Sequence, residues 1–246
     1  MELHAPEGGI HSWRDFFVHM ATIVLGIMIA IGLEQSVEAI HHRYERRQLE
    51  SDIHADLEAN VKRVEYDRRI YEGQRAALVE LRAAVEARRA GQDATTPDVS
   101  ARRSATGVMP SFAAWEAARQ SGTLALLPNA EVRIDSRFLF QLDRLSDAMA
   151  EFEKSALDLE SFEERFRDSP GAFDMQMKDP APDIRSMSPE ELEEYSQLLS
   201  RMIKSLDRFT IRMRFVDMED RVLLSGVRND EEMLREMSRQ MGASYR

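Results

Sequence analysis

Apolar residues form one uninterrupted stretch near the start of the chain, residues 16–33, which reads FFVHMATIVLGIMIAIGL. Its only strongly polar member is His19. Eighteen helical residues extend over about 27 Å, close to the thickness of a bilayer's hydrocarbon core. The pattern therefore predicts a transmembrane helix over 16–33, preceded by an N-terminal tail over 1–15, with Trp13 at the membrane interface.

Two other interpretations of this stretch stay open. It also resembles a cleaved signal peptide, with Ala30-Ile31-Gly32 as the cleavage site, or the buried helix of a soluble core. A secretory signal begins with a basic segment, whereas Glu2, Glu7 and Asp15 outnumber the single Arg14 here. The acidic flank favours an uncleaved membrane anchor.

Small residues recur every four positions on the predicted span, at Thr22, Gly26 and Ala30. This spacing places them in one row on a helix, and such rows let a second membrane helix approach closely. We therefore expect association through this row, either with another membrane protein or with a second copy of the chain.

Helical periodicity continues through most of the remaining chain. Residues 34–90 contain one glycine and no proline, which predicts a stalk helix continuous with the span. Apolar positions spaced alternately three and four apart predict long helices over about 129–168 and 188–241, and 111–121 is typical of a short helix. Residues 188–191, Ser-Pro-Glu-Glu, carry the signature of a capped helix start.

Three long amphipathic helices with matching stripes predict an all-α fold. The economical arrangement is an antiparallel, coiled-coil-like three-helix bundle over residues 34–246, with the short helix as an extra element. In the simplest course of the chain, the stalk leads away from the membrane, the second long helix returns and the third leads out again.

Composition narrows the function. The 246 residues include 44 acidic and 33 basic side chains and no cysteine. The net charge of -11 argues against nucleic acid as a partner, because phosphate binding needs a concentrated basic surface. The missing thiols exclude cysteine nucleophiles and cysteine-ligated metals.

Five polar residues interrupt the apolar seams or lie beside them: Asn60, Asp67, Gln74, Glu163 and Asp220. A polar group in a helix seam costs free energy unless it is paired. We interpret these residues chiefly as determinants of helix register, with a polar pocket or ion site between helices as the alternative.

The sequence contains no HExxH, GxSxG, Walker or dinucleotide-binding motif, so we expect no catalytic residues, no enzymatic activity and no cofactor. Met175, Met177 and Met187 are the residues that a soft metal would use. Packing of these methionines onto the bundle is the simpler interpretation, and we expect no metal site.

The segment PEGGIHSWRDFFVHMATIVLGIMIAIGLEQSVEAIHHR, the later ESDIHADLEANV and the residues Trp115, Ser121, Gly122 and Leu124 resemble a family of bacterial proteins of unknown function. The resemblance covers about half of the chain. It implies a single-pass protein of the bacterial inner membrane with a helical soluble region in the periplasm, and it implies no activity.

These observations together predict a membrane-anchored helical protein that acts by association. Its role would be that of an accessory or scaffolding subunit of a larger membrane complex, or of a homo-oligomer. A sensor that transmits a signal through the span is the alternative, and a metal- or ligand-binding bundle is a third. Orientation stays open, because Arg43, Arg46 and Arg47 after the span favour a cytoplasmic soluble region.

Overall fold

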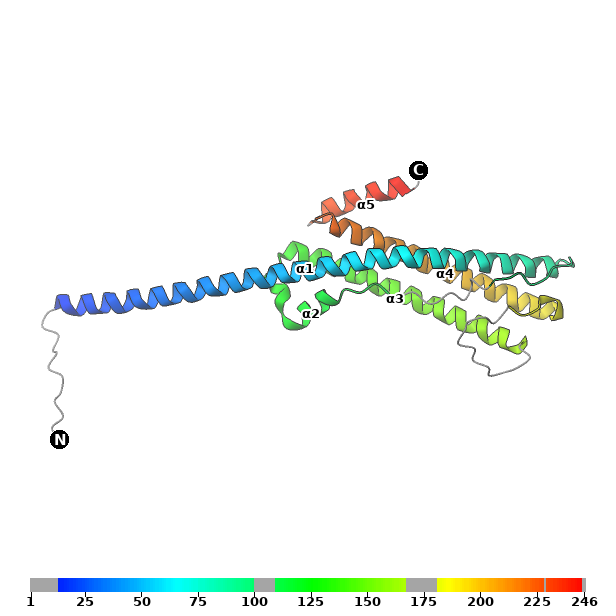
Figure 1. The fold of residues 1–246 in the computed structure, drawn as a ribbon, viewed down its shortest axis with the longest axis horizontal. Coiled ribbons are helices and arrows are strands. Elements are labelled where there is room, and N and C mark those ends of the chain that lie inside the picture. The colour runs from blue at the N-terminus through cyan, green and yellow to red at the C-terminus, as the bar shows by residue number, and fades with distance from the viewer. Residues whose placement is uncertain (1–12, 100–108, 167–180, 228, 245–246) are drawn as a thin grey trace, which may run out of the picture. The chain divides into compact units, whose positions relative to one another are not determined.

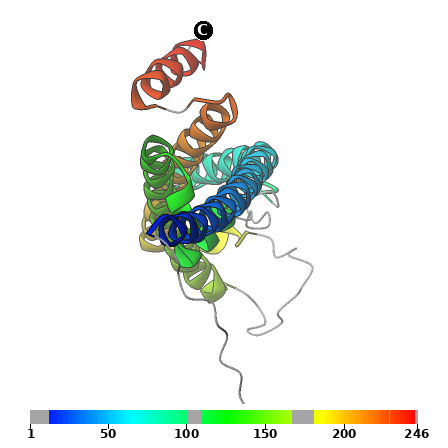
Figure 2. The same cartoon turned by 90° about the vertical axis from the view of Figure 1, so that its left-hand side faces the viewer.

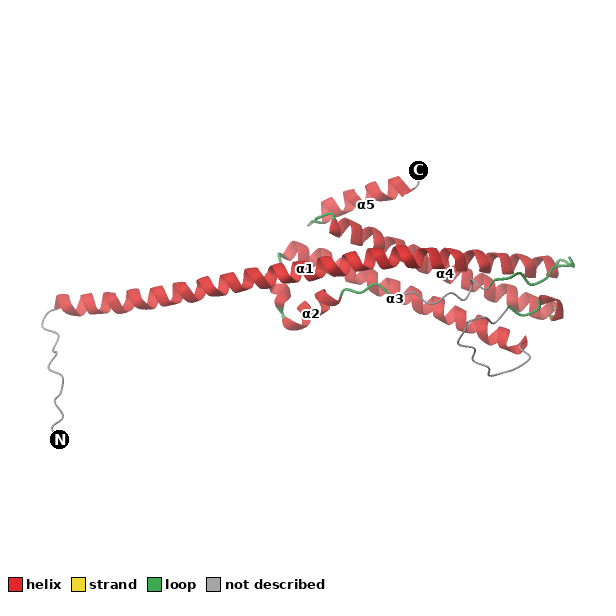
Figure 3. Ribbon diagram, viewed as in Figure 1, coloured by secondary structure: helices red, strands yellow, loops and turns green. Residues whose placement is uncertain are grey.

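The computed structural model describes residues 13–99, 109–166, 181–227 and 229–244. All regular structure within these ranges is helical, which confirms the predicted all-α class (Figure 3). Contacts divide the chain after Glu50 into an N-terminal unit and a C-terminal unit. Most of the predicted tail, residues 1–12, lies outside the described residues.

The N-terminal unit contains the first part of helix α1, which begins at Trp13 and ends at Arg89. This helix is long and apolar enough to cross a bilayer, and none of its apolar window is buried. The Thr22 hydroxyl donates to the Val18 carbonyl at 2.8 Å. Bonding to the helix's own backbone lets a hydroxyl lie in a hydrocarbon environment without an unsatisfied donor.

Three long helices provide the core of the C-terminal unit: the second part of α1, α3 (Asn129–Glu163) and α4 (Pro189–Leu224). Each helix contributes a ring to one aromatic cluster. The Tyr71 ring centroid lies 5.0 Å from that of Phe209 and 6.2 Å from that of Phe152. The edge-on geometry of Tyr71 against both rings is the arrangement that aromatic side chains prefer.

Helix α4 runs antiparallel to α1. Near the end of α1, Arg89 pairs with Glu193 at the start of α4, and further back along α1, Arg75 pairs with Asp207 at 2.6 Å. The end of α1 therefore contacts the start of α4, and an earlier part of α1 contacts a later part of α4.

Helix α3 is also antiparallel to α4 and so runs in the same direction as α1 (Figure 1). The pairs that establish this order are Glu163–Tyr195, Glu151–Arg208 and Arg137–Glu219. The predicted course, in which the second long helix returns and the third leads out, is wrong.

Before α3 begins, the chain lies again beside an earlier part of α1. Residues 109–114, here called the returning segment, make three contacts with it: Arg63 with Met109, Asn60 with Ser111, and Asp56 with Ala114. The segment between α1 and α3 therefore packs along α1 as well as connecting the two helices.

The predicted short helix is present as α2 (Ala113–Ser121), and Gly122 ends it with a positive φ of 82°. The Phe112 and Trp115 rings stack at 5.8 Å, and Phe112 lies edge-on to Phe138 of α3 at 5.0 Å. These aromatic contacts hold the start of α2 against α3.

The start predicted for the last long helix is confirmed. The Ser188 hydroxyl accepts from the Glu191 amide at 3.2 Å, and the Glu191 carboxylate accepts from the Ser188 amide at 2.8 Å. Two donors that the first helical turn leaves unpaired are thereby satisfied.

The helix predicted over 188–241 is divided into two. Helix α4 ends at Leu224, Gly226 adopts a φ of 87°, and α5 follows from Asp230 to Ser244 beside the end of α4 (Figure 2). Asn229 caps α5 by accepting from the Glu232 amide at 3.0 Å. Met233 and Met237 of α5 are buried, so this helix also has a packed apolar face.

Replacement of Tyr71 by alanine tests the aromatic cluster. We expect Tyr71→Ala to lower the free energy of unfolding by about 3 kcal/mol, because it removes a buried ring at the meeting point of three helices. Tyr66→Ala is the matched control, since Tyr66 is an exposed tyrosine on the same helix. Denaturant unfolding of the full chain in detergent, followed by circular dichroism, measures both; equal losses would contradict the packing.

Candidate functional site

The five polar seam residues all lie buried, but they do not form one site. Asn60 and Asp220 come together where α1 faces α4. Glu163 lies elsewhere, where its carboxylate accepts from the Tyr195 hydroxyl at 2.7 Å. Asp67 and Gln74 lie on α1 between these places.

Asn60 binds the returning segment through both of its amide atoms. Its Nδ2 donates to the Ser111 carbonyl at 2.9 Å, and its Oδ1 accepts from the Ser111 amide at 3.0 Å. One turn earlier, the Asp56 carboxylate accepts from the Ala114 amide at 2.8 Å, near the start of α2. These polar side chains of α1 therefore position the start of α2. The interpretation of the seam residues as determinants of helix register stays a prediction.

Two adjacent acidic residues of α4, Glu219 and Asp220, are the unusual feature of the core. They are 1% and 0% exposed. Within the described residues, no hydrogen-bond partner reaches any of their four carboxylate oxygens. Arg137 of α3 is the nearest cation to Glu219, at 4.0 Å.

Burial raises the pKa of Glu219 to about 7, with Arg137 acting in the opposite direction. Burial also raises the pKa of Asp220, to about 8. Asn60 of α1 and Arg221 of α4 oppose that shift, while Asp217 and Glu219 of α4 add to it. With a pKa of about 8, Asp220 is mainly protonated near neutral pH, and this avoids an uncompensated charge in the core.

The other seam residues are conventional by comparison. Desolvation also raises the pKa of Asp67, and Arg63 opposes it. Tyr195, whose hydroxyl donates to Glu163, stacks its ring on that of Phe162, with the ring centroids 5.0 Å apart. The Arg165 guanidinium lies over the Phe162 ring, 4.1 Å from its centroid. This cluster fastens the end of α3 to the start of α4.

Glu219, Arg137 and the Ser111 contact were not among the predicted site residues. Glu219 does not interrupt the apolar spacing, so periodicity alone gives it no signal. The adjacent acids Glu219-Asp220 beside a seam position were the available clue.

The predicted membrane residues lie on the exposed surface of the N-terminal unit. Thr22, Gly26 and Ala30 occupy the unburied apolar stretch, and a side chain at Gly26 would meet no atom within 4 Å. Trp13 is exposed beside Phe16 and Phe17, whose ring centroids are 5.9 and 6.1 Å away. Three neighbouring aromatic rings at the start of an apolar helix are typical of a membrane interface.

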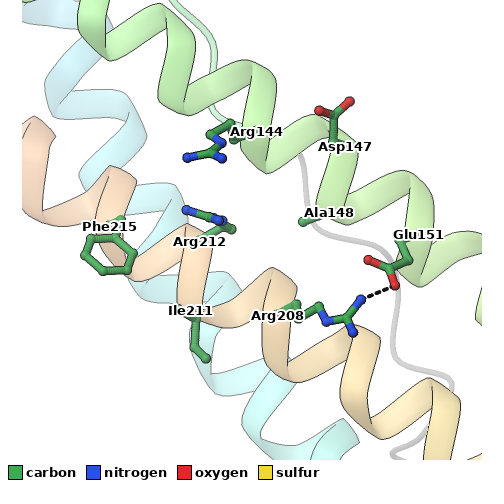
Figure 4. A pocket seen from close by; sticks show the side chains of 8 residues that line it. All are labelled: Arg144, Asp147, Ala148, Glu151, Arg208, Ile211, Arg212 and Phe215. Carbon is green, nitrogen blue, oxygen red and sulfur yellow. Dashed lines mark hydrogen bonds and ion pairs between the residues drawn. The ribbon is translucent and has the colours of Figure 1, made fainter.

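A groove of about 390 Å³ lies between α3 and α4 on the surface of the C-terminal unit (Figure 4). Arg144 of α3 and Arg212 of α4 point toward each other across it. Its remaining lining residues are Asp147, Ala148, Glu151, Arg208, Ile211 and Phe215. This groove was not predicted, because its lining residues lie outside the apolar seams that periodicity reveals.

The described residues hold no group of three or more histidine or acidic side chains arranged to bind a metal. The histidines of α1 instead lie beside glutamates of the same helix, as His41 does with Glu45 at 3.1 Å.

Comparisons of the chain with protein-family models, with curated proteins and with solved structures give no match. The resemblance of the N-terminal segment to a bacterial membrane family therefore stays a prediction.

The buried acids predict that stability depends on pH. An unfolded chain ionises Asp220 near pH 4, whereas the folded chain keeps its proton until about pH 8. The stability contribution is therefore complete below pH 4 and is lost as pH rises toward 8. We expect Asp220→Asn to raise the free energy of unfolding by about 2 to 4 kcal/mol at pH 8.

At pH 4 the same substitution should change little, because most of the difference in ionisation between the folded and unfolded states develops above that pH. Asp158→Asn is the control, since Asp158 is an exposed aspartate on α3. Denaturant unfolding at both pH values measures the difference. A pH-independent effect of Asp220→Asn would contradict a protonated Asp220.

Proposed function

We propose that this protein is a single-pass, membrane-anchored helical protein that acts by association. It would serve as an accessory or scaffolding subunit of a larger membrane complex, or as a homo-oligomer. The resemblance described above supports a bacterial inner membrane, with the soluble region in the periplasm. In this proposal the long helices act as a coiled-coil-like bundle without catalytic activity.

The observation that carries the proposal is the apolar window of α1, of which no part is buried. Burial of apolar surface is favourable by about 25 cal/mol per Å², so eighteen uncovered residues would strongly disfavour a free existence in water. A lipid bilayer covers such a helix on all sides. Where a second helix replaces lipid, small side chains give the closest approach, and the Thr22, Gly26 and Ala30 row offers that surface.

An exposed apolar stripe that begins at the last residue of the predicted span adds to this argument. Leu33, Val37, Ile40 and Tyr44 follow each other at spacings of four, three and four, and each is at least 63% exposed. Glutamates lie among or directly after these residues, at positions 34, 38 and 45. Charged side chains at this density are typical of a helix in water rather than in lipid. A stripe with heptad spacing that is exposed to water is the surface that a partner helix covers.

The second candidate function is a sensor without an output of its own. The buried acids Glu219 and Asp220 favour it, because their ionisation would place charge in the core beside α1 and α3. A change there would alter how these helices pack, and α1 is the helix that contains the apolar stretch. Such a sensor would need a partner to convert the change into an output.

Substitution in the small-residue row tests association. We expect Gly26→Ile to reduce the yield of associated protein by about tenfold, because a branched side chain separates the helices and removes about 1.4 kcal/mol of packing. Gly32→Ile is the matched control: it introduces the same side chain in the same span, and Gly32 also has open space around it. Position 32 lies on another face of the helix.

The measurement is cross-linking in intact cells, purification of the tagged chain in mild detergent and mass spectrometry of the proteins recovered with it. A second polypeptide in fixed ratio would identify an accessory subunit, and self-cross-links alone would identify a homo-oligomer. A monomer without a partner, together with a Gly26→Ile variant that behaves like the parent, would contradict the proposal.

Cysteine cross-linking separates the scaffold from the sensor, because the chain has no cysteine of its own. We expect an Ile40→Cys variant to form the same cross-link at pH 6 and pH 8.5 if the protein is a scaffold. A cross-link that changes between these pH values, and stops changing when Asp220→Asn is added, would favour the sensor. Variants with cysteine at Ala39, one position away on the helix, control for reactivity of the thiol.

A further inference from the structure

The groove between α3 and α4 has an excess of positive charge, because three arginines and two carboxylates line it. Arg208 is paired with Glu151 across it. Arg144 and Arg212, in contrast, point toward each other (Figure 4), and neither makes an ion pair within the described part of the chain. Two guanidinium groups that face each other repel, and an anion between them would relieve the repulsion.

Apolar side chains accompany these cations. Ile211 is 52% exposed and Phe215 is 37% exposed, and both line the groove. Phe140 is exposed beside it, with the Arg144 guanidinium 5.2 Å from its ring centroid. Arginine and aromatic side chains are the types that contribute most to the energy of protein interfaces. The groove therefore combines two arginines that make no ion pair with another described residue and exposed apolar side chains.

The spacing of the lining residues fits a helix. On α3 they lie at positions 144, 147, 148 and 151, and on α4 at 208, 211, 212 and 215, which are the i, i+3, i+4 and i+7 positions of one helix face. A helix that lies between two antiparallel helices meets side chains at this spacing on both sides. From Phe140 to Glu151 the groove side of α3 is about 16 Å long, the length of three helical turns.

We propose that the groove between α3 and α4 binds an acidic amphipathic helix of a partner polypeptide, which lies along both helices as a fourth helix. Its carboxylates bind Arg144 and Arg212, and its apolar face covers Ile211 and Phe215. The inference rests on the proposed function in one respect, that the protein acts by association, and it names the surface and the chemistry of the partner.

Site-specific photo-cross-linking of the full chain in its native cells tests this. A photoreactive phenylalanine derivative replaces Ile211, and in a control chain it replaces Leu157, an exposed apolar residue of α3 outside the groove. Mass spectrometry then identifies the cross-linked peptide. We expect position 211, and not position 157, to capture a helical segment with carboxylates and apolar residues spaced three and four apart.

Charge reversal tests the role of the arginines. We expect Arg212→Glu to reduce the cross-link from position 211 by at least about tenfold, as loss of a charge-assisted contact does. Arg214→Glu is the matched control, because Arg214 is an exposed arginine two positions away on the other side of α4. A carboxylate-to-arginine change in the captured segment should restore the cross-link of the Arg212→Glu chain.

The inference is overturned if positions 211 and 157 give the same products, or if position 211 captures lipid or a segment without carboxylates. Equal effects of Arg212→Glu and Arg214→Glu would also overturn it. Thermal unfolding followed by circular dichroism checks that the Arg212→Glu and Arg214→Glu variants are both folded. If a partner co-purifies under these outcomes, the proposed function stands and only the groove assignment fails; if nothing associates with the chain, the proposed function fails.

Discussion

Burial of one apolar stripe of α1 by α3 and α4 is the interaction on which the C-terminal unit depends. A single long helix has no core of its own, so α1 gains tertiary stability only where other helices cover its stripe. The cluster of Tyr71, Phe152 and Phe209 is the place where all three helices contribute large rings. The remaining elements of this unit follow from that burial: α2 is held by the aromatic contacts of Phe112, and α5 by buried methionines.

Polar groups inside this core have two different consequences. Asn60 bonds the backbone of Ser111 through both its amide nitrogen and its amide oxygen, and so determines where the returning segment lies on α1. Burial raises the pKa of Glu219 to about 7 and that of Asp220 to about 8, so that protonation of these acids lowers the cost of burying a charge. One kind of polar residue therefore specifies the arrangement, and the other makes it responsive to pH.

The same physical requirement explains the two surfaces that we propose for association. The apolar stretch of α1 and the stripe from Leu33 to Tyr44 are uncovered apolar surface in the N-terminal unit. In the groove of the C-terminal unit, Arg144 and Arg212 face each other and make no ion pair with another described residue. A lipid bilayer would cover the first surface, whereas carboxylates of a partner would pair with the arginines of the second.

The sequence by itself determined the helices, the apolar stretch and the burial of positions such as Asn60 and Asp220, because helical periodicity reveals which face of each helix is covered. It did not determine the direction of α3, since a stripe spaced three and four apart is the same when read in either direction. The break at Gly226 was not predicted either, because the apolar positions on both sides of it, up to Val227 and from Met233 onward, have helical spacing and do not reveal the turn between them. The contact of Asn60 with Ser111, the burial of Glu219 and the facing arginines of the groove were decided only by the tertiary structure, because each depends on which residues of distant segments become neighbours.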